Sequence, residues 1–282
     1  MSDAVGPDFS HLPPATGRLG AVFARPKRVA VGCIVALTAL GWLYLAVLTA
    51  QTDGALAALC RPALTPAAGW SAGGLALIWS MWAAMVLAMM LPSAAPMILT
   101  YTEIAETAAR KGEPIVSPIA IAAGFSLVWL GFASAAALAQ LALARAALLD
   151  SGLVSASGLL SGAIFIGAGL YQFSALKHAC LRQCRQPFPF FFAHWETTMR
   201  GVVRLGVRQG LYCLGCCWAM MLVMFAVGAM NVVWMAGLAA VMTVEKLVSG
   251  NRLTYALGVA LIAAGAAFVV AGFAAHWPLR AI

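Results

Sequence analysis

The sequence predicts an all-α protein, a polytopic bundle of about seven transmembrane helices. Of its 282 residues, 63% are hydrophobic and only 9% are charged, and uncharged runs of membrane-spanning length recur along the chain. Soluble domains carry roughly 25% charged residues, and about 20 apolar residues suffice for one crossing. Because a bilayer offers no water to the backbone, such runs satisfy their peptide groups by forming helices.

Seven helices cover these runs, and residues 26–282 are predicted to form a single transmembrane domain. Residues 1–25 are rich in Pro, Gly and Ser and are predicted to be a disordered cytoplasmic tail. The first apolar run is longer than the core of a typical signal peptide and is interpreted as a membrane anchor. The helices are predicted at 29–50, 73–101, 118–144, 152–176, 210–229, 231–247 and 254–275.

Two of the runs are too long or too irregular for one straight helix. The run 209–244 would measure about 54 Å as one helix, against a hydrocarbon core of about 30 Å. Two short helices divided near 228–231 are therefore expected, with a re-entrant pair as the alternative. The run 70–102 contains Pro92 and Pro96. Because proline lacks a backbone donor and clashes with the preceding turn, the helix is expected to kink or end there.

The basic residues set the orientation. Lys and Arg concentrate in alternate loops, with the largest group between Lys177 and Arg208. The positive-inside rule then places the amino terminus in the cytoplasm, and we expect a multi-pass protein of the bacterial inner membrane. The net charge of +8 attracts anionic lipids of the bilayer. No basic face is interleaved with exposed aromatic residues, so nucleic acid is not an expected partner.

Three cysteines, Cys213, Cys216 and Cys217, lie inside one uncharged run. Residues three and four positions apart share a helix face, and the same spacing continues to Met220 and Met224. Thiolate and thioether groups are ligands that Cu(I) and other soft metals prefer. Met and free Cys also pack as ordinary hydrophobes, so adaptable core packing is the alternative interpretation.

A second group of ligands precedes this run in the basic loop. Cys180 and Cys184 lie one turn apart if the preceding helix continues. Cys213 lies only four residues inside the next run, at a similar membrane depth. Thiols that face the cytosol are normally reduced, which favours metal binding over a disulfide; an incidental CxxxC near a helix end is the alternative. The predicted metal ligands are Cys180, Cys184, Cys213, Cys216, Cys217 and His178.

Methionines repeat in the proline-containing helix. Met81, Met85 and Met89 recur every four residues, and a proline-broken membrane helix often lines a binding site. With Met220 and Met224 they are predicted to line a route or a second weak site across the membrane. The alternative is a kinked helix that serves packing alone.

Two ionisable residues, Glu245 and Lys246, end an uncharged run near the inner surface. An acidic group at this depth is costly unless it is paired or solvated. We expect Glu245 to pair with a basic residue of the preceding loop, with a role as hard ligand or proton acceptor as the alternative. Lys246 is expected to extend outward to the surface.

Three motifs together resemble a known family. They are MWAAMVLAMMLPSAAP at 81–96, KHACL at 177–181 followed by Cys184, and GLYCLGCCWAMM at 210–221 followed by Glu245 and Lys246. The chain resembles a bacterial domain-of-unknown-function family described as predicted metal-binding integral membrane proteins, over roughly residues 75–250. The resemblance implies a metal-binding membrane protein and carries over no substrate or reaction.

These observations predict the binding and handling, or transport, of a soft metal, with Cu(I) as the bound ion. A metallochaperone or a membrane subunit is the expected kind of protein partner. No phosphate loop, serine triad or paired carboxylates are found, so no catalytic residue is predicted. Two other classes stay open: a membrane thiol-redox protein, with a disulfide from Cys180 or Cys184 to Cys213, and a structural subunit of a membrane complex that binds no metal.

Overall fold

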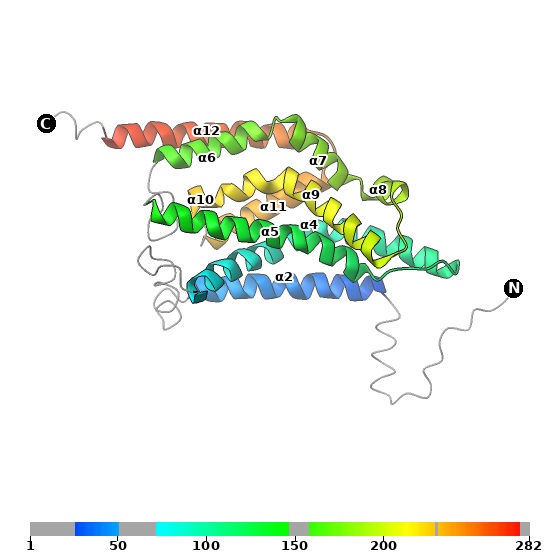
Figure 1. Cartoon of the computed structure of the whole chain (residues 1–282). Coiled ribbons are helices and arrows are strands. Elements are labelled where there is room, and N and C mark those ends of the chain that lie inside the picture. Colours follow the sequence, from blue (N-terminus) through cyan, green and yellow to red (C-terminus); the bar gives the residue numbers. More distant parts are fainter. Residues whose placement is uncertain (1–25, 51–71, 147–157, 229–230, 277–282) are drawn as a thin grey trace.

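The computed structural model describes residues 26–50, 72–146, 158–228 and 231–276, and within these ranges the protein is all-helical, as predicted (Figure 1). The predicted disordered tail, residues 1–25, lies outside the described residues. The described helices are α2 (Pro26–Ala50), α4 (Ala72–Arg110), α5 (Pro118–Arg145), α6 (Gly158–Tyr171), α7 (Ala175–Arg185), α8 (Pro187–Ala193), α9 (Met199–Leu222), α10 (Met224–Val227), α11 (Val232–Leu247) and α12 (Arg252–His276).

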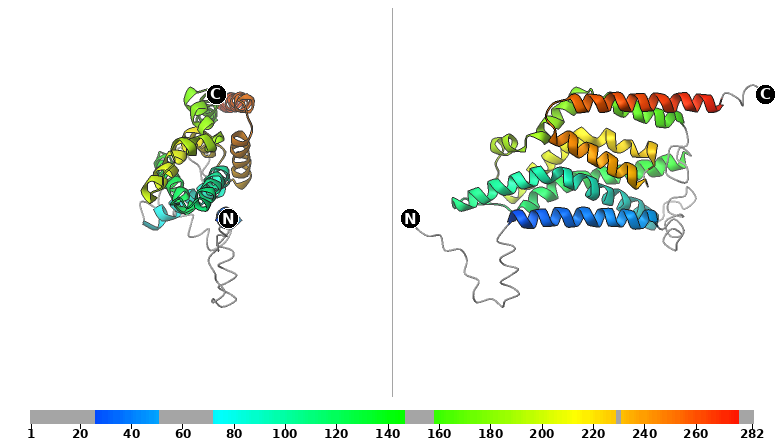
Figure 2. Two further views of the ribbon diagram at one scale, coloured as in Figure 1. Left: turned by 90° about the vertical axis from the view of Figure 1, so that its right-hand side faces the viewer. Right: turned by 180° about the vertical axis from the view of Figure 1, so that it is seen from behind.

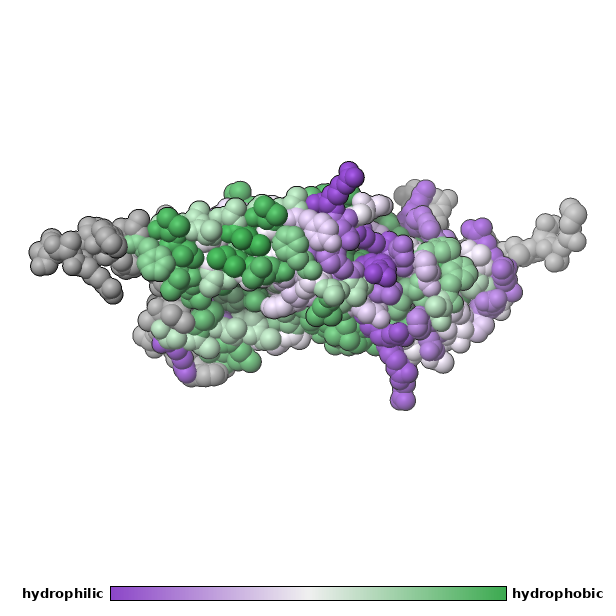
Figure 3. Space-filling model, turned by 90° about the horizontal axis from the view of Figure 1, so that it is seen from above, coloured by the Kyte–Doolittle hydropathy of each residue, from purple (hydrophilic) through white to green (hydrophobic). Residues whose placement is uncertain are grey.

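The long helices lie side by side in one elongated bundle. Helix α2 packs along α4 on one side, α6 pairs with α12 on the opposite side, and α5, α9 and α11 lie between them. The same order is seen from behind in Figure 2. Helices α7 and α8 lie at the end of the bundle where α2 begins. On the face shown in Figure 3, hydrophilic residues gather toward that end and the opposite half is apolar.

Five helical spans of the described chain are long and apolar enough to cross a membrane. Helices α6 and α7 meet this criterion only as a pair, bent by 64° at their junction, and α11 has only 16 residues. The structure therefore has five or six candidate crossings, and the predicted count of about seven is not confirmed. The five spans are Lys27–Leu48, Gly73–Arg110, Pro118–Arg145, Met199–Val227 and Arg252–Phe273.

Close contact between α5 and α9 holds the centre of the bundle. A Cβ atom on Gly124 would lie 2.2 Å from the carbonyl oxygen of Val203, and one on Gly206 would lie 2.2 Å from that of Ile121. Small residues allow two membrane helices to approach this closely. The contact fixes the position of α9, which carries three of the predicted cysteine ligands, against α5.

The predicted break near 228–231 is confirmed. Helix α10 ends at Val227, and Gly228 adopts a φ of +97°, a backbone conformation that glycine adopts without steric cost. Helix α11 begins at Val232, where the side chain of Asn231 accepts a hydrogen bond from the N–H of Trp234. Asparagine is among the preferred residues at this capping position.

Three predicted helix boundaries are wrong. Helix α4 passes through both prolines and continues to Arg110, because helices packed against α4 make proline tolerable in apolar surroundings. The helix predicted at 152–176 breaks after Tyr171, and residues 152–157 of it lie outside the described ranges. Helix α9 begins at Met199 rather than at 210, because arginines in its first turns interrupt the apolar pattern without ending the helix.

Candidate functional site

The bend between α6 and α7 directs two cysteines toward α9. The side chain of Ser174 accepts a hydrogen bond from the N–H of Lys177 and starts α7 as an N-cap. Helix α7 then packs along α9. Because residues three and four apart share a helix face, Lys177, Cys180, Leu181 and Cys184 lie on one side of α7, and the first three of them are buried.

Four thiols gather where α7 meets α9. The Sγ atoms of Cys184 and Cys216 lie 3.8 Å apart, and those of Cys216 and Cys217 lie 3.3 Å apart. The thiol of Cys216 also donates a hydrogen bond to the carbonyl oxygen of Cys213. Cys213, Cys216 and Cys217 are buried and Cys184 is partly buried. We call Cys184, Cys213, Cys216 and Cys217 the thiol cluster.

Cys180 lies beside the thiol cluster, against the backbone of α9. Its Sγ atom would be only 2.6 Å from a Cβ on Gly215, so the sulfur packs directly on that glycine. The hydroxyl of Tyr171 donates a hydrogen bond to the carbonyl oxygen of the same residue. Gly215 is thus contacted by Tyr171 before the bend and by Cys180 after it. Because Gly215 has no side chain, Cys180 can approach α9 closely.

His178, the other predicted ligand, faces a different helix. Its ring packs against that of Tyr255 at the start of α12, with ring centroids 5.3 Å apart. Both ring nitrogens are buried and make no hydrogen bond within the described part of the chain. Four of the predicted ligands are therefore in contact, and Cys180 lies next to them. His178 lies on α7 as well, but its ring faces α12 and is separated from the group.

Glu245 forms the expected ion pair, and the pair is buried. The Nζ atom of Lys177 lies 2.9 Å from Oε2 of Glu245, with 0% and 2% of the two side chains exposed. The guanidinium of Arg185 donates two hydrogen bonds, at 3.0 and 2.8 Å, to the backbone carbonyl of Glu245. These contacts join α7 to α11, so the predicted pairing of Glu245 with a basic residue of that region is confirmed.

Lys246 does not extend to the surface, and that prediction is wrong. Its side chain turns inward, where Nζ lies 3.1 Å from Sγ of Cys213 and 2.8 Å from Oγ of Ser93. Two acceptors within the bundle hold the ammonium more favourably than an extended path through apolar side chains would. Sequence reasoning did not predict that Ser93 or Lys246 would contact a cysteine.

A small cavity lies beside these contacts. It has a volume of about 20 Å³, which is roughly the room that one water molecule needs. Helices α4, α5, α7, α9 and α11 each contribute to its wall. Its lining residues are Ser93, Ala94, Met97, Phe125, Cys184, Gln209, Cys213 and Lys246.

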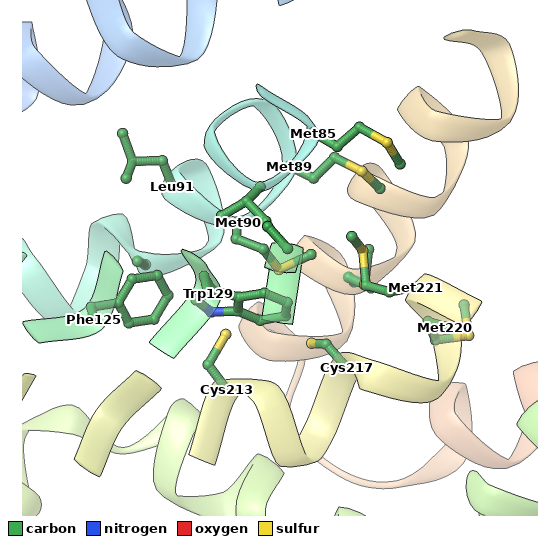
Figure 4. Close-up of a cluster of buried hydrophobic side chains, with 14 of the residues drawn as sticks. Met85, Met89, Met90, Leu91, Phe125, Trp129, Cys213, Cys217, Met220 and Met221 are labelled. Atoms are coloured by element: carbon green, nitrogen blue, oxygen red, sulfur yellow. The ribbon is translucent and has the colours of Figure 1, made fainter. Parts of the chain in front are cut away.

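Buried methionines continue from the thiol cluster along α4 and α9. Figure 4 shows Cys213 and Cys217 on the side of α9 that faces α4, with Met221 farther along the same side. Met85 and Met89 extend toward this region from α4. Every predicted route residue is buried, and so is Met221, which was not predicted to be part of the route. The buried route residues are Met81, Met85, Met89, Met220 and Met224.

Comparison with known proteins identifies the family. A family described as copper chaperone, PpoB2, matches residues 79–268, which include all four residues of the thiol cluster. The chain belongs to this copper chaperone family. No curated protein and no solved structure matches the chain.

The thiol cluster brings sulfur ligands together without forming a closed metal site. The sulfurs of Cys184 and Cys216, 3.8 Å apart, are close enough for one ion to contact both. The Cys216–Cys217 separation of 3.3 Å is shorter. Within the described residues, no three His, Cys, Asp or Glu side chains surround one point as a closed metal site would. Binding therefore needs the thiols to exchange their mutual contacts for the ion.

Proposed function

We propose that the protein binds Cu(I) at the thiol cluster within the bacterial inner membrane and hands it to a partner protein. The proposal takes the orientation predicted by the positive-inside rule, with the amino terminus in the cytoplasm. The end of the bundle with α7 and α8, where α2 begins, then faces that compartment. The observation that supports this most directly is the approach of Cys184 on α7 to Cys216 on α9, at 3.8 Å.

The chemistry of the cluster supports a soft ion as cargo. Thiolates bind Cu(I), zinc and iron–sulfur clusters, and thioethers favour soft ions such as Cu(I). The cluster is followed by buried thioethers rather than by carboxylates, which favours Cu(I). The proposal includes two further ligands, Cys180 and His178. Cys180 already lies next to the thiol cluster, whereas His178 packs against Tyr255. For His178, binding the same ion would require the start of α7 to turn away from Tyr255.

The methionines supply the second half of the proposal, a path for the ion. A thioether binds Cu(I) as a neutral ligand, without losing a proton, so it holds the cation less tightly than a negatively charged thiolate does. Figure 4 shows Met221 beyond Cys217 on α9. The same view shows Met85 and Met89 on the neighbouring helix α4. A series of weak sites leading away from a strong one suits the transfer of a bound ion to an acceptor.

Metal analysis of the intact protein tests the proposal. The wild-type protein, purified in detergent and loaded with Cu(I) without oxygen, is expected to retain copper after removal of free metal. The triple variant Cys213→Ser, Cys216→Ser, Cys217→Ser is expected to lose most of it. Cys33→Ser is the matched control, because this free thiol is exposed on α2, away from the thiol cluster. Equal copper in the wild-type protein and the triple variant would place the site elsewhere.

The short distance between Cys184 and Cys216 also fits the alternative of a membrane thiol-redox protein, since two thiols in contact form a disulfide after a small movement. The intact mass without reductant separates the two functions. A copper-handling protein is expected to keep four free thiols in the cluster under cytosolic redox conditions, whereas a redox protein is expected to cycle between thiols and a disulfide.

A further inference from the structure

Arginines gather at the end of the bundle that leads to the thiol cluster. The segment 175–222, which carries every cysteine of the cluster, has six basic residues and one acidic residue, Glu196. Lys177 is buried and paired with Glu245, so the other five basic residues are arginines without that partner. No carboxylate of the described chain forms an ion pair with any of them. We call Arg182, Arg185, Arg200, Arg204 and Arg208 the arginine group.

Two of these arginines extend the face of α9 that meets α7. Arg204 and Arg208 precede Gly215 by about three and about two helical turns, so the three residues lie on one face of α9. Cys180 packs on Gly215, so this is the face along which α7 lies. The two guanidinium groups therefore continue the line of the α7–α9 contact toward the start of α9.

Other contacts place arginines next to the most accessible thiol. Cys184 is the member of the thiol cluster that is only partly buried, and Arg185 follows it at the end of α7. Cys184 also lines the small cavity with Gln209, the residue after Arg208. The guanidinium of Arg208 lies 5.5 Å from the ring centroid of Phe190 in α8. A molecule that approaches Cys184 from this end of the bundle therefore meets positive charge first.

Most carboxylates at the same end of the bundle lie on the other side of α8. Phe190 of α8 faces α9, whereas Phe191 packs against α4. Glu103 and Glu113 line a cavity on the Phe191 side. Glu196 packs against the first turn of α9 and offsets part of the positive charge there. The arginine group thus outnumbers the carboxylates on its own side of α8.

This distribution of charge repels a free metal cation and attracts an anion. A guanidinium group stays protonated in proteins, so the repulsion acts on any uncomplexed Cu(I) ion that approaches from this end. A complex in which carboxylate-bearing thiols hold Cu(I) has a net negative charge and is attracted by the same field. Charged surfaces of this kind raise the association rate of an oppositely charged ligand by a factor of about 10 to 10³.

We infer that the arginine group receives copper as an anionic Cu(I)–thiolate complex and guides this complex to Cys184. The inference rests on the proposed function, because it takes the thiol cluster as the metal site. The exchange needs no oxidant or reductant. A Cu–S bond to the carrier breaks as a Cu–S bond to Cys184 forms, and copper stays Cu(I). Any proton that the cysteine releases passes to the thiolate of the departing carrier.

Two copper donors with the same thiol and different charge test the inference. Glutathione carries carboxylates, and in its diethyl ester these groups are masked. The full-length protein, in an uncharged detergent and without oxygen, is mixed with the Cu(I) complex of each donor, and rapid desalting measures bound copper against time. The wild-type protein is expected to load at least about tenfold faster from the glutathione complex at low salt. This preference is expected to shrink toward an ionic strength of about 1 M, where the Debye length is about 3 Å.

Arginine variants that leave the contacts of the bundle intact supply the comparison. Arg182, Arg200 and Arg204 are exposed. Replacing all three by Gln is expected to slow loading from the glutathione complex at least about fivefold at low salt, without slowing loading from the ester complex or lowering the final copper content. Replacing all three by Lys keeps the charge and is expected to keep the preference. The double variant Arg110→Gln, Lys111→Gln removes exposed charges near the end of α4 and is expected to change the rate by less than about twofold.

The outcomes separate this inference from the proposed function. A wild-type protein that retains no copper would contradict the proposed function, and the inference with it. Copper retention with the same donor preference in the Gln and Lys variants would leave the proposed function intact and overturn only the role of the arginine group.

Anionic phospholipid headgroups carry the other negative charges that arginines at a membrane surface can bind. The loading experiment is therefore repeated in nanodiscs with and without anionic lipid. A preference for the glutathione complex that persists in both supports the inference. A preference that disappears when anionic lipid is present would assign the arginine group to lipid headgroups and overturn it.

Discussion

Lys177 and Glu245 form an ion pair that is almost completely buried, at 2.9 Å between Nζ and Oε2. The pair connects α7 to α11, and Arg185 strengthens the same connection through the backbone carbonyl of Glu245. Helix α7 carries Cys184, so the ion pair fixes one side of the thiol cluster. The position of a predicted metal ligand therefore depends on a pair of charges that bind no metal.

Removing one member of this pair is expected to destabilise the protein strongly. Glu245→Gln leaves the ammonium of Lys177 buried without a compensating charge, which costs about 3–5 kcal/mol in the free energy of unfolding. The double variant Lys177→Met, Glu245→Leu replaces both charges by apolar groups and is expected to recover most of the loss. Thermal unfolding of the detergent-purified proteins measures both changes. A double variant less stable than the single variant would show that the pair itself is stabilising.

The contact between α5 and α9 predicts a contrast between two glycines. Gly206→Ala would place a methyl group 2.2 Å from the carbonyl oxygen of Ile121, so the helices must separate, at a cost of about 1–3 kcal/mol. Gly131→Ala, on α5, has nothing within 4 Å of the added atom. It is expected to be neutral or to stabilise by up to about 1 kcal/mol through helix propensity.

The same unfolding experiment compares the two glycine variants. Since α9 carries three cysteines of the thiol cluster, Gly206→Ala is also expected to lower Cu(I) retention. Equal stability of Gly206→Ala and Gly131→Ala would show that the two helices are free to move apart.

The cap of α7 predicts a local effect. Ser174→Ala removes the hydrogen bond to the N–H of Lys177, and loss of an N-cap costs about 1 kcal/mol. Opening of α7 is then expected to be about fivefold more frequent, which the rate of maleimide labelling at Cys184 reports in a protein lacking other reactive thiols. Ser174→Thr keeps a hydroxyl at the cap and should label at nearly the wild-type rate. Equal rates for Ala and Thr would argue against α7 opening as the limiting step.

Composition and spacing predicted the helical class, the break before Asn231, and the shared face of Cys213 and Cys217, because each depends on neighbours along the chain. The bend after Tyr171 was missed, although Ser174 is a residue typical of helix starts. No Gly or Pro marks the bend, and the apolar run continues through it.

Contacts between distant segments were harder to predict. The sequence places Lys246 next to Glu245 and gives no sign that the two side chains point in different directions, one to Cys213 and the other to Lys177. That difference depends on how α4, α7 and α9 surround the end of α11. His178 shows the reverse case: its spacing from Cys180 is suitable for a shared metal, but helix geometry turns its ring to Tyr255.

The buried methionines predict a separation between holding copper and passing it on. Met85→Leu and Met221→Leu keep a side chain of similar volume, so they are expected to change stability by less than about 1.5 kcal/mol and to leave the copper stoichiometry unchanged. They remove thioethers that extend toward one another from α4 and α9 (Figure 4). Transfer of Cu(I) from the loaded protein in lipid nanodiscs to an acceptor chelator is therefore expected to slow several-fold.

Met199→Leu is the matched control for these route variants, because that methionine is 59% exposed at the start of α9. It is expected to change neither copper retention nor the transfer rate. Unchanged transfer in Met85→Leu and Met221→Leu would reduce the methionines to packing residues. Loss of copper in either variant would instead move them into the binding site itself, since a leucine differs from methionine chiefly in lacking the sulfur that a soft ion binds.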